Sequence, residues 1–300
     1  MYEQISRNKR RSFLLILFFF LLIFGLVWVF GQLTELGEYA VIPAVLIAGV
    51  MTFISYYSSD KIALAVSRAR PVEKKEYPHL YNVVEGLAVA AGIPQPRCYV
   101  IDDSAPNAFA SGRNPKNSVI AVTTGLLDKL NRAELEGVVA HEMSHIKNYD
   151  ILVQTLAVVM VGVIALLSDW IMRVFFWGGR GRRRSGGSRN RSGDAGAIFL
   201  VIGLALAILS PLIAQLLRLA VSRKREFLAD ASSVMLTRYP PGLISALRKL
   251  SADTEPLEVA NKATAHMYII NPLKEHKGAM NKLFSTHPPI EDRIAALESL

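Results

Sequence analysis

Two histidines stand four residues apart in the stretch VVAHEMSHIKNYD, residues 138–150, and a glutamate follows the first of them. Residues i and i+4 lie on one face of an α-helix, so His141 and His145 can present ring nitrogens to a single metal ion. Glu142 is badly placed to be a ligand, but it can reach a water molecule at that metal and take its proton. The pattern indicates metal-assisted hydrolysis, and the alternative is a pair of surface histidines on an amphipathic helix.

This HExxH arrangement occurs in zinc metallopeptidases. A catalytic zinc ion takes three protein ligands and keeps an open position for water, so one ligand must come from elsewhere. The segment RKREFLAD offers Glu226 and Asp230, again at i, i+4 spacing. One carboxylate can bind the metal while the other accepts a hydrogen bond from a ligand imidazole. Standing alone, this pair would be interpreted as an exposed acidic helix face.

The helix that carries the histidines has a start signal of its own. Asn131 precedes Glu134 by three residues, which is the pattern of an N-cap and its capping-box partner. Leu135, Val138 and Val139 supply its apolar face.

The segment before that helix predicts a mixture of helix and strand. In YPHLYNVVEGLAVAAGI, apolar residues recur at helical spacing until Gly92 and Pro94 end the pattern. The stretches RCYVID and NSVIAVTTGLL are rich in β-branched residues and predict strands. Between them, DSAPNAFASGRNPK is rich in turn residues.

Four apolar runs interrupt the chain, at residues 13–30, 40–57, about 151–177 and about 197–217. The first has 18 residues without a charge, which on a helix spans roughly 27 Å, about the hydrocarbon thickness of a bilayer. It is longer than the apolar part of a secretory signal peptide and has no evident cleavage site, so we expect a retained transmembrane helix.

Basic residues surround the first two runs, and the net charge of the chain is +9. Because positive residues favour the cytoplasmic side, we expect the N-terminus and the region after residue 58 to face the cytoplasm, beside anionic lipid. The tract GGRGRRRSGGSRNRSGDAG between the last two runs reads as a solvated connector rather than a nucleic-acid site. Those two runs cross the bilayer twice or not at all, and we expect two crossings.

Cys98 is the single cysteine, so no intramolecular disulfide can form, and this suits a reducing compartment. We expect it to be a core residue rather than a nucleophile.

HEMSH, a hydrophobic hairpin, SRKREFLAD and FSTHPPIEDRI together resemble the HtpX membrane metalloproteases, relatives of the CAAX prenyl endopeptidases. The resemblance covers essentially the whole chain, including the opening MYEQISRNKRR and the segment APNAFASG. It implies that His141, His145 and Glu226 are zinc ligands, with one zinc ion per chain. It further implies that Glu142 is the catalytic base and that Asp230 is the carboxylate behind a ligand.

The resemblance also implies roles at the substrate. His287 and Arg293 match positions that polarise the substrate carbonyl or steady the oxyanion, although His287 alone could be a turn histidine before two prolines. Asn107 and Ala108 match an edge strand that runs beside an extended substrate and pairs with its main chain. His79, His266 and His276 have no identifiable partner and are expected to be structural.

We therefore expect a predominantly α-helical integral membrane protein with a gluzincin-like metallopeptidase domain containing a small β-sheet. It would cleave membrane or misfolded polypeptides at the cytoplasmic face of the cell membrane, in quality control or a stress response, with the lipid bilayer as its other partner. The expected parts are two transmembrane helices (1–57), a cytoplasmic part with the HEMSH helix (58–150), an apolar hairpin (151–217) with an Arg/Gly-rich loop (178–196), and a second cytoplasmic part with the third ligand and the THPP region (218–300).

Three other classes of protein remain open. A processing protease for specific lipid-modified or membrane substrates is allowed by the family tie, although four apolar runs are fewer than that branch is expected to have. An intramembrane protease would bury its HExxH in the bilayer, whereas polar NRAELEG and KNYD flank it here. A non-catalytic membrane scaffold that keeps zinc for structure would normally use four protein ligands.

Overall fold

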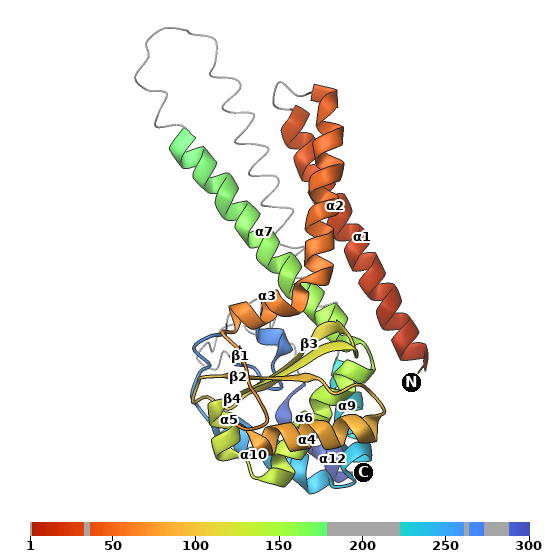
Figure 1. Cartoon of the computed structure of the whole chain (residues 1–300), viewed down its shortest axis with the longest axis vertical. Coiled ribbons are helices and arrows are strands. Elements are labelled where there is room, and N and C mark those ends of the chain that lie inside the picture. Colours follow the sequence, from red (N-terminus) through yellow and green to blue (C-terminus); the bar gives the residue numbers. More distant parts are fainter. Residues whose placement is uncertain (1, 33–36, 179–222, 261–263, 273–287) are drawn as a thin grey trace.

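Three long helices rise from a mixed helical and β part that lies below them in Figure 1. The computed structural model describes residues 2–32, 37–178, 223–260, 264–272 and 288–300. Helix α1 (Tyr2–Gln32) and helix α2 (Val41–Tyr57), the latter preceded by the 3-10 helix η1 (Gly37–Ala40), run in opposite directions, and α7 (Asp150–Gly178) leans away beside them.

The first two helices have the length and composition of membrane spans. Within the described residues, Ile5–Val29 and Gly37–Tyr57 are long and apolar enough to cross a bilayer. Large apolar side chains are exposed along both, as lipid-facing surface would be; examples are Phe13, Leu17, Leu21, Ile42, Leu46, Val50 and Phe53. The spanning stretch of α1 begins earlier than the predicted run because the basic segment before residue 13 is helical as well.

Helix α7 begins inside the protein. Residues 151–161 are all buried, and its inner face packs against Leu15, Phe19 and Ile23 of α1. The axis turns by 83° between the preceding helix and α7, and Tyr149 at that break has a positive φ of 60°. The loop 178–196, except Gly178, and the run 197–217 lie outside the described residues. Their crossing of the bilayer stays a prediction.

A four-stranded sheet lies under the long helices. Its strands are β1 (Arg70–Pro71), β2 (Arg97–Ile101), β3 (Ala108–Asn114) and β4 (Asn117–Thr123), in the order β1-β2-β4-β3. β2 and β4 are parallel, and the other two pairs are antiparallel. The strand prediction for RCYVID is therefore confirmed. That for NSVIAVTTGLL is confirmed as far as Thr123 and wrong for its last four residues, which begin helix α5 (Thr124–Lys129). The segment expected to be only turn-rich contains β3. Small residues there let β3 lie between β4 and the buried start of α7.

The remaining helices cover the sheet and complete the core (Figure 1). They are α3 (Ser59–Val66), α4 (Pro78–Ala91), α5 (Thr124–Lys129), α6 (Arg132–Lys147), α9 (Arg223–Thr237), α10 (Pro240–Ala252), η3 (Ala265–Met267) and α12 (Ile290–Glu298). Helix α4 ends as predicted at Gly92, which is left-handed with φ 68°. The expected fold class is confirmed: a mostly helical protein with membrane-spanning helices and a small mixed sheet.

Candidate active site

Helix α6 carries the HEMSH motif, and its ends and neighbours fix its position. The predicted capping box is present, with the Asn131 side chain and Glu134 bonded reciprocally at the first turn. Gly137 lets α10 approach closely, because a Cβ at this position would lie 2.7 Å from the backbone nitrogen of Leu243. The hydroxyl of Ser233 donates to the Gly137 carbonyl at 2.9 Å and holds α9 against the same turn. The motif thus faces α9 across a tight helix pair.

Three metal-ligand atoms converge between α6 and α9. The Nε2 atoms of His141 and His145 lie 3.2 Å apart, and each lies 3.6 Å from a carboxylate oxygen of Glu226. All three side chains are buried, and their ligand atoms lie within 4.8 Å of one another. The arrangement brings two α6 histidines to the first turn of a helix more than 70 residues further along the sequence.

A carboxylate from α9 holds the first imidazole. Nδ1 of His141 lies 2.8 Å from Asp230, and Asp230 accepts two hydrogen bonds, at 2.7 and 2.8 Å, from the guanidinium of Arg293. Arg293, from α12, also donates to the carbonyl of Ile269 at 3.0 Å. Burial opposes the charge on Asp230, but the facing guanidinium outweighs it and lowers the pKa of this carboxyl. Asp230 therefore stays ionised and orients His141.

A different carboxylate, which no motif in the sequence had indicated, holds the second imidazole. Nδ1 of His145 lies 3.1 Å from Asp150, the first residue of α7. Asp150 accepts hydrogen bonds from Asn8 of helix α1 at 2.7 Å and from Arg225 of α9 at 3.1 Å. Asn8 also donates to the carbonyl of Asn148 at 2.8 Å. The only sequence signal was a lone acid at the head of an apolar run.

The two ring orientations together leave a space suited to a cation. If each Nδ1–H donates to its carboxylate, the tautomers are fixed and both Nε2 atoms carry lone pairs. Those lone pairs face each other at 3.2 Å, which is unfavourable unless a proton or a metal ion lies between them. Two imidazoles and a carboxylate form a donor set that zinc accepts in catalytic sites. The residues present therefore fit a bound zinc ion.

The electrostatics of the site agree with this geometry. Burial alone disfavours a charged imidazole, but hydrogen bonds to Asp230 and Glu226 outweigh it and raise the pKa of His141 to about 9. The field that favours a proton there equally favours a metal cation. Burial raises the pKa of Glu142, which accepts a hydrogen bond from the backbone N–H of Ala110 on β3. A raised pKa brings a carboxylate closer to the range useful for a general base.

The described residues that were expected to contact substrate are buried and already have hydrogen-bond partners. Ala108, the first residue of β3, and Asn107 before it are both buried. The Asn107 amide donates to the carbonyl of Ile270, and the Ala108 carbonyl accepts from the N–H of Ile269. His287 lies outside the described residues, so its predicted role is untested.

Two other expectations concern residues away from the site. Cys98 is buried in β2, and burial raises the pKa of its thiol to about 11, so it has the character of a core residue. Of the histidines expected to be structural, His266 is buried and lies 3.2 Å from the carbonyl of Gln154, His79 is exposed on α4, and His276 lies outside the described residues.

Comparison with known proteins also indicates a metallopeptidase. The model of "Peptidase family M48" matches residues 74–300. A "Protease HtpX homolog" of Dictyoglomus thermophilum is 49% identical over all of this chain and 94% of its own length. Another from Thermoanaerobacter pseudethanolicus is 44% identical over all of this chain and 98% of its own length. The crystal structure of S. mikatae Ste24p shares the fold with a TM-score of 0.50 and 21% identity, covering 99% of this chain and 67% of that one.

Fold, site and relatives define a membrane metalloprotease. The chain belongs to peptidase family M48. The resemblance found in the sequence is thereby confirmed, and membership implies a metal ion, typically zinc.

Proposed function

We propose that His141, His145 and Glu226 hold one zinc ion per chain and that Glu142 is the catalytic base of a peptide-bond hydrolase. The convergence of the three buried ligand atoms supports this assignment, as do the two carboxylates that set the imidazole tautomers. A site of two histidines and a carboxylate suits other divalent ions too, and zinc is the native ion that we propose.

In the proposed reaction, zinc supplies Lewis-acid polarisation of a water molecule and of the scissile carbonyl. Glu142 takes a proton from the water as the oxygen attacks the carbonyl carbon, and then delivers that proton to the leaving amine nitrogen. The Ala110 N–H holds the Glu142 carboxylate in place against β3. The products are a new carboxylate and a new amine.

Arg293 is best supported as a positioning residue. All three of its nitrogens contact Asp230 or the Ile269 carbonyl, and its side chain is 0% exposed. Its proposed work is to hold Asp230, and through it His141, in place. Roles for Arg293 and His287 in steadying the oxyanion stay predictions.

The substrates that we propose are extended segments of membrane or misfolded proteins, bound along the edge of β3. For Asn107 and Ala108 to pair with such a segment, the chain around Ile269 must first leave that edge, because it already occupies the Ala108 carbonyl. Main-chain pairing of this kind binds peptides without demanding a sequence, which suits quality control in the cell membrane.

The orientation that we propose places the active site on the cytoplasmic side. Basic residues cluster before the first span and after the second, at the ends of the two helices that lie next to the peptidase part. The site then lies close to the membrane surface, where a polypeptide at the edge of the bilayer can reach it.

The test compares the detergent-purified chain with Glu142→Gln and with Glu136→Gln, a control on the same helix that pairs with exposed Arg132. Each protein is stripped with chelator, zinc is restored, and cleavage of an unfolded protein and of the chain itself is followed on a gel. We expect Glu142→Gln to bind zinc stoichiometrically but to lose activity by about 10²–10⁴-fold. Retained cleavage in that variant would refute the base assignment. Zinc binding without cleavage in wild type and Glu136→Gln would favour a scaffold.

A further inference from the structure

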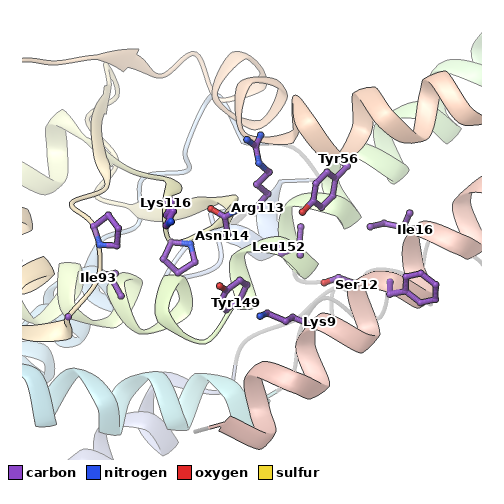
Figure 2. A pocket seen from close by; sticks show the side chains of 14 residues that line it. Lys9, Ser12, Ile16, Tyr56, Ile93, Arg113, Asn114, Lys116, Tyr149 and Leu152 are labelled. Atoms are coloured by element: carbon purple, nitrogen blue, oxygen red, sulfur yellow. The ribbon is translucent and has the colours of Figure 1, made fainter.

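A cavity of about 740 Å³ lies between the membrane helices and the sheet, and the proposed zinc site contributes none of its walls. Figure 2 shows its residues on three sides: Lys9, Ser12 and Ile16 from α1 face Arg113 and Asn114 at the end of β3 and Lys116 in the turn that follows, with Tyr149 and Leu152 between them. The remaining labelled residues are Tyr56, from the end of α2, and Ile93, after α4. Five separate parts of the chain thus meet around one hollow.

The charge of the cavity has one sign. Lys9, Arg113 and Lys116 line it, and none of the described residues in its walls is acidic. Lys9 lies over the ring of Tyr149 at 4.6 Å, and Arg113 lies over the ring of Tyr57 at 4.9 Å and donates to the Tyr57 carbonyl. Within the described chain, none of these three cations forms an ion pair. Their charges are therefore available to an anion.

The apolar walls of the cavity continue into the membrane part. Phe13 and Ile16 follow Lys9 along α1 within the stretch Ile5–Val29 that can span a bilayer. Phe13 is 63% exposed, so apolar surface leads out of the hollow along α1. A ligand that matches this surface has an anionic group at one end and a hydrocarbon chain at the other.

We propose that this cavity binds the headgroup of an anionic phospholipid, with the phosphate among Lys9, Arg113 and Lys116 and an acyl chain along α1. The cations lie at the end of two membrane spans, where headgroups are found, and the volume is of the size that small-molecule sites have. An acidic peptide would use the same cations but would leave the exposed apolar face of Phe13 without a partner.

The site joins two parts of the molecule. Lys9 belongs to α1, whereas Arg113 lies at the end of β3 and Lys116 in the β3–β4 turn, so a lipid between them fastens the membrane helix to the peptidase part. Bound lipid should therefore raise the unfolding temperature as well as leave a binding signal. Neither readout depends on proteolysis, so the proposal can fail or succeed independently of the proposed function.

The experiment measures binding of fluorescent dioleoyl phosphatidylglycerol to the full chain in neutral detergent, with unlabelled competitors. Arg113→Gln combined with Lys116→Gln removes two cavity cations. Lys61→Gln combined with Arg68→Gln removes two exposed cations near the same ends of the spans, which do not line the cavity. Lys116→Gln alone, at an exposed position, covers the case in which the Arg113 change impairs folding.

We expect the cavity pair to weaken binding about tenfold or more and the control pair to change it less than twofold. Lys116→Gln alone should give an intermediate loss. At ten times the dissociation constant, phosphatidylglycerol should raise the unfolding temperature of wild type by about 3 °C, and phosphatidylcholine should not.

Three results would overturn the proposal. Equal losses in the two double variants would mean general attraction to a basic surface. Competition by glycerol phosphate as strong as that by the full lipid would assign the cavity to a free phosphate ligand. Displacement of the label by an acidic peptide at lower concentration than by phosphatidylglycerol would assign it to a polypeptide.

Discussion

The two imidazoles of the site are held from opposite directions. His141 is held by Asp230 and Arg293, which come from α9 and α12 in the C-terminal part of the chain. His145 is held by Asp150, which in turn is bonded to Asn8 of the first membrane helix. The first support is a bidentate and fully buried ion pair. The second combines a single hydrogen bond from Arg225 with one from a neutral amide on the first membrane helix.

This difference means that the membrane helices do more than anchor the protein. The family model begins at residue 74, yet Asn8 reaches a carboxylate that sets the tautomer of a proposed ligand. A shift in the position of α1 would thus change the hydrogen bonding behind His145 but not that behind His141. Variants behind His141 should therefore mainly lower the stability of the protein, whereas variants behind His145 should mainly lower its affinity for the metal.

Asp230→Ala should have the largest effect. It leaves the guanidinium of Arg293 buried without its carboxylate, which costs about 3–5 kcal/mol of folding free energy, and it removes the acceptor that orients His141. We expect a fall in unfolding temperature of about 10 °C or more together with weakened zinc binding. Thermal unfolding with and without zinc measures both. Asp292→Ala, an exposed acid on the same helix as Arg293, is the control, and equal stability of the two variants would contradict the account.

Asp150→Ala should weaken zinc binding about 10–100-fold, as the loss of a hydrogen-bond partner behind a ligand histidine usually does. The loss of stability should be smaller than in Asp230→Ala, because Arg225 loses a single hydrogen bond to Asp150 whereas Arg293 would lose a bidentate pair. Zinc affinity from competition with a chromophoric chelator gives the result. Asp150→Asn keeps an oxygen that can accept from His145 and should recover part of the affinity. An unchanged affinity in Asp150→Ala would show that His145 does not depend on this carboxylate.

Asn8→Leu should have the smallest effect, a loss of a few-fold to tenfold in zinc affinity, since it removes an uncharged donor from Asp150 and from the Asn148 carbonyl and leaves Arg225 in place. Ser12→Ala is the matched control: Ser12 is buried one turn further along α1, and its hydroxyl has no hydrogen-bond partner among the described residues. The same chelator competition applies to both variants. Equal zinc affinity in the two would break the proposed connection between α1 and the site.

The parts of the structure that sequence could predict are those with local causes. The start of α6 follows from Asn131 and Glu134, three residues apart. That His141 and His145 lie on the same face of the helix follows from helical spacing. Helix α4 follows from its apolar periodicity and the glycine that ends it. Each of these signals lies within one or two helical turns.

The parts that could not be predicted depend on distant partners. β3 reads as turn residues and becomes a strand because β4 pairs with it. Asp150 lies five residues after His145, beyond the end of α6, so helical spacing does not place them together. They meet only because the chain turns by 83° at this point. Asn8, the hydrogen-bond partner of Asp150, lies 142 residues away, in a segment whose composition indicated only a membrane helix.

X-ray absorption at the zinc edge, on the full chain purified with one equivalent of zinc, tests the central claim most directly. The account predicts two imidazoles together with oxygen donors at about 2.0–2.2 Å and no sulfur. Sulfur scattering at about 2.3 Å, or fewer than two imidazoles, would show that the ion is not held by His141, His145 and Glu226.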